Sequence, residues 1–100
     1  MNDKELTDEL VRTVLGWRVA PGRFLQTGRS WIQRWRFNPM TSTDDAFQLL
    51  DQAGARYRLT FEGTRFTAEI WVGGQRGEGS GEGKAKTITV ALARALQIKV

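Results

Sequence analysis

The glycine run near the C-terminus constrains the fold of this chain more than any other stretch. Six glycines occur within eleven residues, at positions 73, 74, 77, 79, 81 and 83, and an amphipathic segment follows directly. A glycine-rich turn at the start of a helix can cradle a phosphate through backbone N–H groups. The same composition also fits a weak strand and a loop that lead into a helix.

The sequence patterns of known phosphate-binding loops argue against the cradle. A P-loop needs a glycine five positions before Gly83 and a hydroxyl residue after Lys84, but these positions hold Glu78 and Ala85. A dinucleotide fingerprint needs its third glycine where Glu82 stands, and no parallel βαβ unit precedes the run. We therefore expect the run to be a flexible edge strand and loop that deliver the last helix onto a sheet.

Length and composition limit the classes of function. One hundred residues are the size of a single domain, which we place at 1–100. Cysteine and histidine are absent, which removes thiolate ligands, the commonest metal ligand and the commonest general base. The pair Asp44 and Asp45 is the one candidate for acid–base chemistry, and acids at a helix start are stabilising there without catalysis. We expect a protein that is not an enzyme and that uses no metal or cofactor.

The ends and the hydropathy of the chain bear on its location. The N-terminal segment MNDKELTDEL is acidic and polar, unlike the basic start and apolar run of a secretory signal. The sequence has no stretch of 18 apolar residues, so we expect no membrane-spanning segment. A cytoplasmic protein is the resulting expectation.

Positive charge is concentrated in the first half of the chain. The formal net charge is +4, and no acidic residue occurs between Glu9 and Asp44. This stretch carries arginines at positions 12, 18, 23, 29, 34 and 36, interleaved with aromatic residues at 17, 24, 31, 35 and 37. Such interleaving is typical of nucleic-acid surfaces. In a small domain the aromatics can instead form the core, with the arginines at its solvated edge, and both interpretations stay open.

Hydrophobic periodicity predicts the order of helices and strands. The expected helices cover 3–15, 43–53 and 86–97, and the expected strands cover 30–37, 56–61, 65–72 and part of 76–80. Ser42 is placed to cap the second helix, Gly16 and Gly54 to end the first two, and Pro21-Gly22 to form a turn. The fold class is α+β: an antiparallel three- to four-stranded sheet with two or three helices, in the order α-(β)-α-β-β-β-α.

The two best strands predict a sheet with one packed face and one wet face, because apolar and polar residues alternate along both. The packed face holds Tyr57, Leu59, Phe61, Phe66, Ala68, Ile70 and Val72. The wet face holds Arg56, Arg58, Thr60, Arg65, Thr67, Glu69 and Trp71. We expect Trp71 to be covered by the segment 17–37 or to lie in an interface, because a bare tryptophan on a wet face marks a contact surface.

The C-terminal half resembles a known RNA-binding domain. FTAEIWVGGQRGEGSGEGKAKTITVALARAL, at 66–96, is similar to the second strand, the glycine-rich third strand and the last helix of the double-stranded RNA-binding domain. That resemblance implies phosphate contacts from lysines at the start of the helix. Lys84 matches the first such lysine, but Ala85 and Ile88 occupy the other two positions and Lys86 is out of register.

A second resemblance covers most of the chain. Its residues are LGW at 15–17, STD at 42–44, and Thr87 and Arg94 within the block 85–95. They resemble the end of the first helix, the opening of the middle helix and the C-terminal helix of the phage ABA sandwich domain family. The resemblance implies a small phage or prophage protein with helices on both faces of the sheet and no catalytic residues. Lys86 departs from the family, because an acidic residue is usual there.

These observations together suggest a function through binding. We expect a phage- or prophage-encoded accessory protein in the bacterial host cytoplasm that inhibits a host defence or nucleic-acid-processing factor, as anti-CRISPR proteins do. Its partner is then a host protein or ribonucleoprotein, and a homodimer is a further option. The alternative is direct binding of double-stranded RNA or DNA through an arginine-rich surface. The candidate contact residues are Arg29, Arg34, Arg36, Arg56, Arg58, Arg65, Trp71, Arg76, Lys84 and Lys86.

Overall fold

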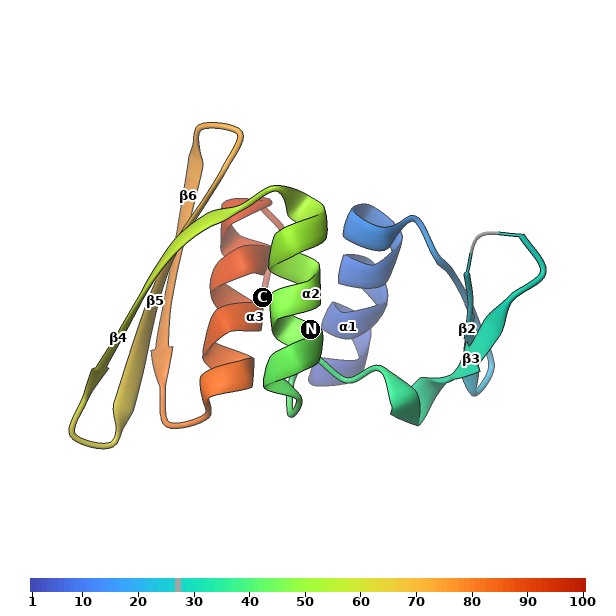
Figure 1. Cartoon of the computed structure of the whole chain (residues 1–100), viewed down its shortest axis with the longest axis horizontal. Coiled ribbons are helices and arrows are strands. Elements are labelled where there is room, and N and C mark those ends of the chain that lie inside the picture. The colour runs from blue at the N-terminus through green and yellow to red at the C-terminus, as the bar shows by residue number, and fades with distance from the viewer. Residues whose placement is uncertain (27) are drawn as a thin grey trace.

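The protein places its helices between two sheets (Figure 1). A computed structural model describes residues 1–26 and 28–100. The elements are α1 (Asp3–Leu10), the π-helical turn η1 (Val11–Leu15), β1 (Arg18–Ala20), β2 (Arg23–Leu25), β3 (Trp31–Gln33), the 3₁₀ turn η2 (Arg34–Arg36), α2 (Thr43–Ala53), β4 (Arg56–Glu62), β5 (Arg65–Val72), β6 (Gln75–Gly81) and α3 (Lys84–Ala95). The fold is therefore α+β, as predicted.

The strands divide between two antiparallel sheets, where the sequence predicts a single one. The N-terminal sheet has the order β1-β2-β3, and the C-terminal sheet has the order β4-β5-β6. The predicted strand 30–37 is extended only in β3, because the chain turns into η2 at Arg34. Three-residue strands are too short to show alternation, so their one visible signal is the turn at Pro21-Gly22. That turn is confirmed between β1 and β2, where Gly22 has φ +71°.

The helix boundaries follow their caps. The Asn2 side chain accepts a hydrogen bond from the Glu5 N–H at 2.8 Å and forms a capping box at the start of α1. Ser42 caps α2 by accepting from the Asp45 N–H at 3.2 Å, and Gly54 ends it with φ +65°. Helix α3 spans Lys84–Ala95 rather than the predicted 86–97, because the chain turns helical directly after Gly83.

The core lies where the three α-helices meet each other and the sheets. Its fully or nearly buried residues include Leu6, Leu10, Phe24, Phe37, Leu49, Leu50, Ile70, Ile88 and Leu92. At the N-terminal sheet, the Trp17 and Phe37 rings pack edge-on with centroids 5.2 Å apart. Some of the aromatic residues interleaved with the arginines therefore belong to the core, as one of the two interpretations predicts. Trp31 and Trp35, which are 51% and 74% exposed, lie outside the core.

Strand β6 approaches α3 so closely that a side chain cannot fit between them. Alternate residues of β6 face the helix, and an added Cβ at Gly77 would lie 2.1 Å from the Ala91 carbonyl oxygen and 2.2 Å from the Ala95 nitrogen. At Gly79 it would lie 3.0 Å from the Thr87 carbonyl oxygen. The predicted edge strand is confirmed, and it pairs with β5 throughout its length. Gly77 and Gly79 let the sheet pack closely on α3, a role that the predicted flexible edge strand and loop did not include.

Helix coverage of the C-terminal sheet is uneven. Ala68 and Ile70 of β5 are buried as predicted, because α3 packs on β5 and β6. Tyr57 and Phe61 of β4 are 45% and 59% exposed, although the sequence predicts them on the packed face. The reason is that β4 is the outer strand of the sheet, beyond the reach of α3.

Candidate functional site

The C-terminal sheet gathers half of the predicted contact residues on its outer face, the one turned away from α3. The registers place Arg56, Trp71 and Arg76 opposite one another across β4, β5 and β6. Arg58, two residues after Arg56 in β4, lies opposite Glu69 of β5. Glu69 in turn lies opposite Glu78 of β6. Arg65 stands at the turn end of the same face. The structure therefore brings these five residues together as one surface.

Carboxylates compensate the arginines on this outer face. The Arg76 Nη2 lies 2.5 Å from a Glu78 carboxylate oxygen and 3.1 Å from one of Glu69. Both hydrogen bonds raise the pKa of Arg76, and the bond to Glu78 has the larger effect. Arg58 makes a longer ion pair with Glu69, at 3.8 Å. Arg58 and Arg76 therefore have carboxylate partners, whereas Arg56 and Arg65 on the same face have none among the described residues. This face offers a polyanion less free positive charge than its four arginines suggest.

Trp71 lies partly buried on the outer face, near the end of the central strand β5 and between Arg56 and Arg76 in the register. Strands β2 and β3, which belong to the segment 17–37, lie at the opposite end of the molecule (Figure 1). The expectation that this segment covers Trp71 is therefore wrong. Its position among charged residues on an exposed strand face follows from its place in the alternation of β5.

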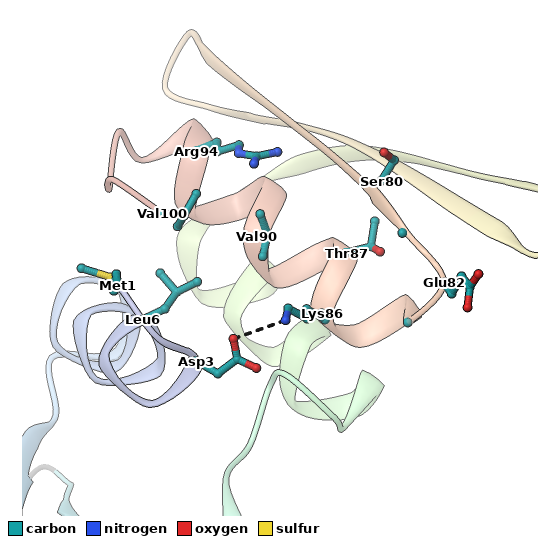
Figure 2. Close-up of a pocket in the computed structure, with 12 residues that line it drawn as sticks. Met1, Asp3, Leu6, Ser80, Glu82, Lys86, Thr87, Val90, Arg94 and Val100 are labelled. Atoms are coloured by element: carbon teal, nitrogen blue, oxygen red, sulfur yellow. Dashed lines mark ion pairs between the residues drawn. The ribbon is translucent and has the colours of Figure 1, made fainter.

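The two lysines at the start of α3 have partners within the fold. The Lys86 Nζ lies 3.4 Å from an Asp3 carboxylate oxygen, an ion pair that Figure 2 shows between α1 and α3. The Lys84 Nζ lies 5.8 Å from the centre of the Phe47 ring in α2. Both lysines therefore lie exposed beside the other helices, and the phosphate contact that the RNA-binding resemblance implies for Lys84 stays a prediction.

A cleft of about 430 Å³ lies between the N-terminus, the end of β6 and α3 (Figure 2). Asp3 and Glu82 supply its negative charge, and Lys86 and Arg94 its positive charge. Arg94 already donates a hydrogen bond to the Glu78 carbonyl oxygen at 2.8 Å. Since both signs of charge line the cleft and several of the charges are paired, it has no evident preference for an ionic ligand.

Arg34 is held inside the fold, which corrects its assignment as a contact residue. Its guanidinium group pairs with Asp8 of α1 and donates to the Lys4 carbonyl oxygen at 3.2 Å. The same group lies 4.8 Å from the centre of the Phe24 ring. The Arg34 side chain is only 22% exposed, so it joins the N-terminal sheet to α1 instead of facing a partner.

The outer face of the N-terminal sheet carries positive charge and an exposed tryptophan. The register places Arg18 and Trp31 on either side of Leu25, with Arg23 two residues along β2 on the same face. The intervening Phe24 points the other way, into the core, where it is fully buried. The Arg23 guanidinium lies 5.5 Å from the centre of the Trp31 ring, which is within the range of a cation–π contact.

Further exposed residues adjoin this face in the chain. Arg29 is exposed before β3, and the Arg36 guanidinium lies 5.7 Å from the Trp35 ring centre in η2. We use the name basic–aromatic surface for Arg18, Arg23 and Trp31 on the outer sheet face, together with the exposed residues next to it in the chain, Arg29, Trp35 and Arg36. Within the described residues, none of its arginines makes an ion pair, which agrees with the lack of acids between Glu9 and Asp44.

Sequence reasoning identified part of this surface and missed the rest. Arg29 and Arg36 are among the predicted contact candidates, whereas Arg18, Arg23, Trp31 and Trp35 belong to the interleaved basic and aromatic stretch but not to those candidates. The usable signal was the acid-free, arginine-rich segment itself. Assigning its faces required the three short strands, because residues on opposite faces of a sheet alternate.

None of the described helices combines the length and the apolarity that crossing a membrane requires. No family model matches the sequence, and no curated protein matches it. Membership of the phage ABA sandwich family therefore stays a prediction.

The fold of the whole chain is similar to that of a solved structure. That structure, the crystal structure of a phage protein from Bacillus cereus ATCC 14579, superimposes with a TM-score of 0.77 at 12% sequence identity. The match covers 100% of this chain and 92% of that protein. The arrangement of helices and sheets in this chain is therefore similar to that of a phage protein.

Proposed function

We propose that this chain is a small phage-encoded accessory protein that acts by binding, and that the basic–aromatic surface is its contact with an anionic partner. The observation that carries the proposal is the charge contrast between the two outer sheet faces. Arg58 and Arg76 on the C-terminal sheet have carboxylate partners, whereas the arginines around Trp31 have none among the described residues. Uncompensated arginines attract acidic surfaces and phosphates.

The first candidate partner is a host protein or ribonucleoprotein of a defence or nucleic-acid-processing system. The likeness to a phage protein fold supports a phage setting. An exposed tryptophan beside arginines is also the composition of interface hot spots. Binding at the nucleic-acid site of such a factor would block its access to substrate.

The second candidate is direct nucleic-acid binding, which the contact between Arg23 and Trp31 favours. An exposed ring stacks on bases, and a neighbouring guanidinium pairs with phosphate. Affinity capture from host lysate, with and without nuclease, separates the two candidates. A partner retained after nuclease treatment supports the protein target, and one lost with nuclease supports nucleic acid. Capture of neither partner, with no binding to labelled RNA or DNA, would contradict the proposal.

Two charge-neutralised variants test the location of the surface. Arg18→Gln/Arg23→Gln is expected to weaken binding of a labelled nucleic acid about tenfold or more at low salt, and to lower the magnitude of the salt slope by about 1.4 to 1.8. Fluorescence anisotropy against duplex RNA, duplex DNA and a single strand measures both quantities.

The matched control is Arg58→Gln/Arg76→Gln, which removes the same charge from the C-terminal sheet. It is expected to change affinity much less, because Arg58 already pairs with Glu69, and Arg76 with Glu69 and Glu78. If the two double variants weaken binding equally, the effect comes from net charge, and the assignment to the basic–aromatic surface is wrong.

A further inference from the structure

The proposed function leaves the free edge of β4 unused. β4 pairs with β5 on one side and, among the described residues, with no strand on the other. Its seven residues present unpaired backbone groups, which form a template for another strand. Tyr57 and Phe61 expose aromatic surface along this edge, as interaction sites do.

We propose that the β4 edge pairs with the β4 edge of a second copy of the chain. The two strands run antiparallel with Leu59 at the two-fold axis, and the C-terminal sheets join into one continuous sheet. The proposal is independent of the basic–aromatic surface, which lies on the other sheet at the far end of the molecule (Figure 1).

The backbone pattern of β4 identifies the residues that are free to pair. A two-residue connection joins Glu62 to Arg65, which lie opposite each other in the register, and such a turn closes on a hydrogen-bonded pair. Bonded and non-bonded pairs alternate along an antiparallel ladder. The N–H and C=O groups of Tyr57, Leu59 and Phe61 therefore point to the free edge, where each residue can exchange two hydrogen bonds with a partner strand.

The side chains are self-complementary when Leu59 is the centre. Arg56 then lies opposite the partner's Glu62, Tyr57 opposite the partner's Phe61, and Arg58 opposite the partner's Thr60. Opposite charges and aromatic pairs that face each other across strands are stabilising. Symmetry produces each of these pairs twice, as in the isologous interfaces of two-fold dimers.

Neighbouring registers fit less well. Only shifts that keep the apolar residues on one face are allowed. Centring the pair on Arg58 would place two arginines opposite each other, and like charges directly opposite are destabilising. Centring it on Thr60 would leave Tyr57 without an aromatic partner.

The exposed aromatics already form short rows that a second copy would extend. The Phe61 and Phe66 rings have centroids 4.6 Å apart, and the Tyr57 and Phe47 rings 5.6 Å apart. The partner's Phe61 would lie beside Tyr57 and thus close to Phe47 of α2. The opposite edge of the sheet is β6, whose glycines offer no such side chains.

Complementary charge reversals test this register. Wild-type protein is expected to sediment with twice the mass of one chain in analytical ultracentrifugation at submillimolar concentration. Arg56→Glu places two carboxylates opposite each other in each pair, and Glu62→Arg places two guanidinium groups there. Each variant alone is expected to lose dimer affinity about tenfold or more. An equimolar mixture of the two is expected to form a heterodimer, because every opposing pair is then of opposite charge.

The controls keep the test decisive. Lys99→Glu makes the same charge change at the exposed C-terminus and should leave the dimer intact, and thermal unfolding of each variant checks that it is folded. A monomeric wild type, a dimer indifferent to both β4 variants, or a mixture that stays monomeric would each overturn the proposal. Capture of a strand from another protein by a monomeric wild type would overturn it as well.

Discussion

Gly77→Ala is expected to lower the free energy of unfolding by more than about 3 kcal/mol, enough to unfold much of a small domain. The new Cβ would lie 2.1 Å from the Ala91 carbonyl oxygen and 2.2 Å from the Ala95 nitrogen. Both are backbone atoms of α3, so they cannot rotate away as the end of a side chain can. The helix would have to move off the sheet as a body and lose its contacts with β5 and β6. Urea denaturation followed by circular dichroism measures the loss.

Two other glycines of β6 provide a graded control. At Gly79 the nearest atom to an added Cβ is the Thr87 carbonyl oxygen at 3.0 Å, and at Gly81 it is the Thr87 hydroxyl oxygen at 3.2 Å. A side-chain hydroxyl can rotate, whereas a carbonyl in a helix cannot. The destabilisation should therefore fall from Gly77→Ala to Gly79→Ala to Gly81→Ala. Equal values for the first and the last would contradict the close packing of α3 on β6.

The glycine series shows what the sequence could predict of the fold. The stretch from Gly77 to Gly81 alternates glycine with Glu78 and Ser80, which is the two-residue period of a strand with one special face. Strand propensity gives glycine a low score because it supplies no side chain for packing. Here the helix backbone fills that space instead. The two-residue alternation of glycine can be seen in the sequence. The close contact between β6 and α3 cannot, because it depends on how α3 lies on the sheet.

The sequence predicts where positive charge is concentrated, but it does not predict which arginines have carboxylate partners or which strands carry them. Four of the six arginines in the acid-free stretch between Glu9 and Asp44 have no ion pair among the described residues, whereas Arg12 pairs with Glu9 and Arg34 with Asp8. The neutralisation of Arg76 was hidden, because it depends on the register that brings Glu69 and Glu78 beside it. The short strands of the N-terminal sheet were hidden for the reason that they carry only three residues each.

Arg34 and Arg36 show how local geometry separates two similar residues. Both arginines are predicted contact residues of the segment 29–36, and in a strand over 30–37 side chains two apart would face the same way. The 3₁₀ turn η2 has about three residues per turn, and it directs the two side chains differently. Arg34 contacts Asp8 and Phe24, whereas Arg36 lies exposed over Trp35.

Arg34→Met is therefore expected to cost about 2 to 3 kcal/mol of stability, because it leaves Asp8 with an unpaired, mostly buried charge. The Asp8 side chain is only 15% exposed, and the Lys4 carbonyl oxygen also loses a donor. Arg36→Met is the matched control, with the same chemical change two residues along. It should alter stability by less than about 0.5 kcal/mol, as exposed substitutions usually do. Urea denaturation of both variants makes the comparison.

A second substitution separates the charge from the packing. Adding Asp8→Asn to Arg34→Met removes the unpaired carboxylate, and it should recover part of the lost stability because a neutral amide is easier to bury than a charge. The effects on binding should be the opposite of those on stability. Arg36→Met should weaken the interaction of the basic–aromatic surface more than Arg34→Met does. If Arg34→Met is instead as stable as Arg36→Met and weakens binding more, the pair with Asp8 contributes little, and Arg34 belongs to the contact surface after all.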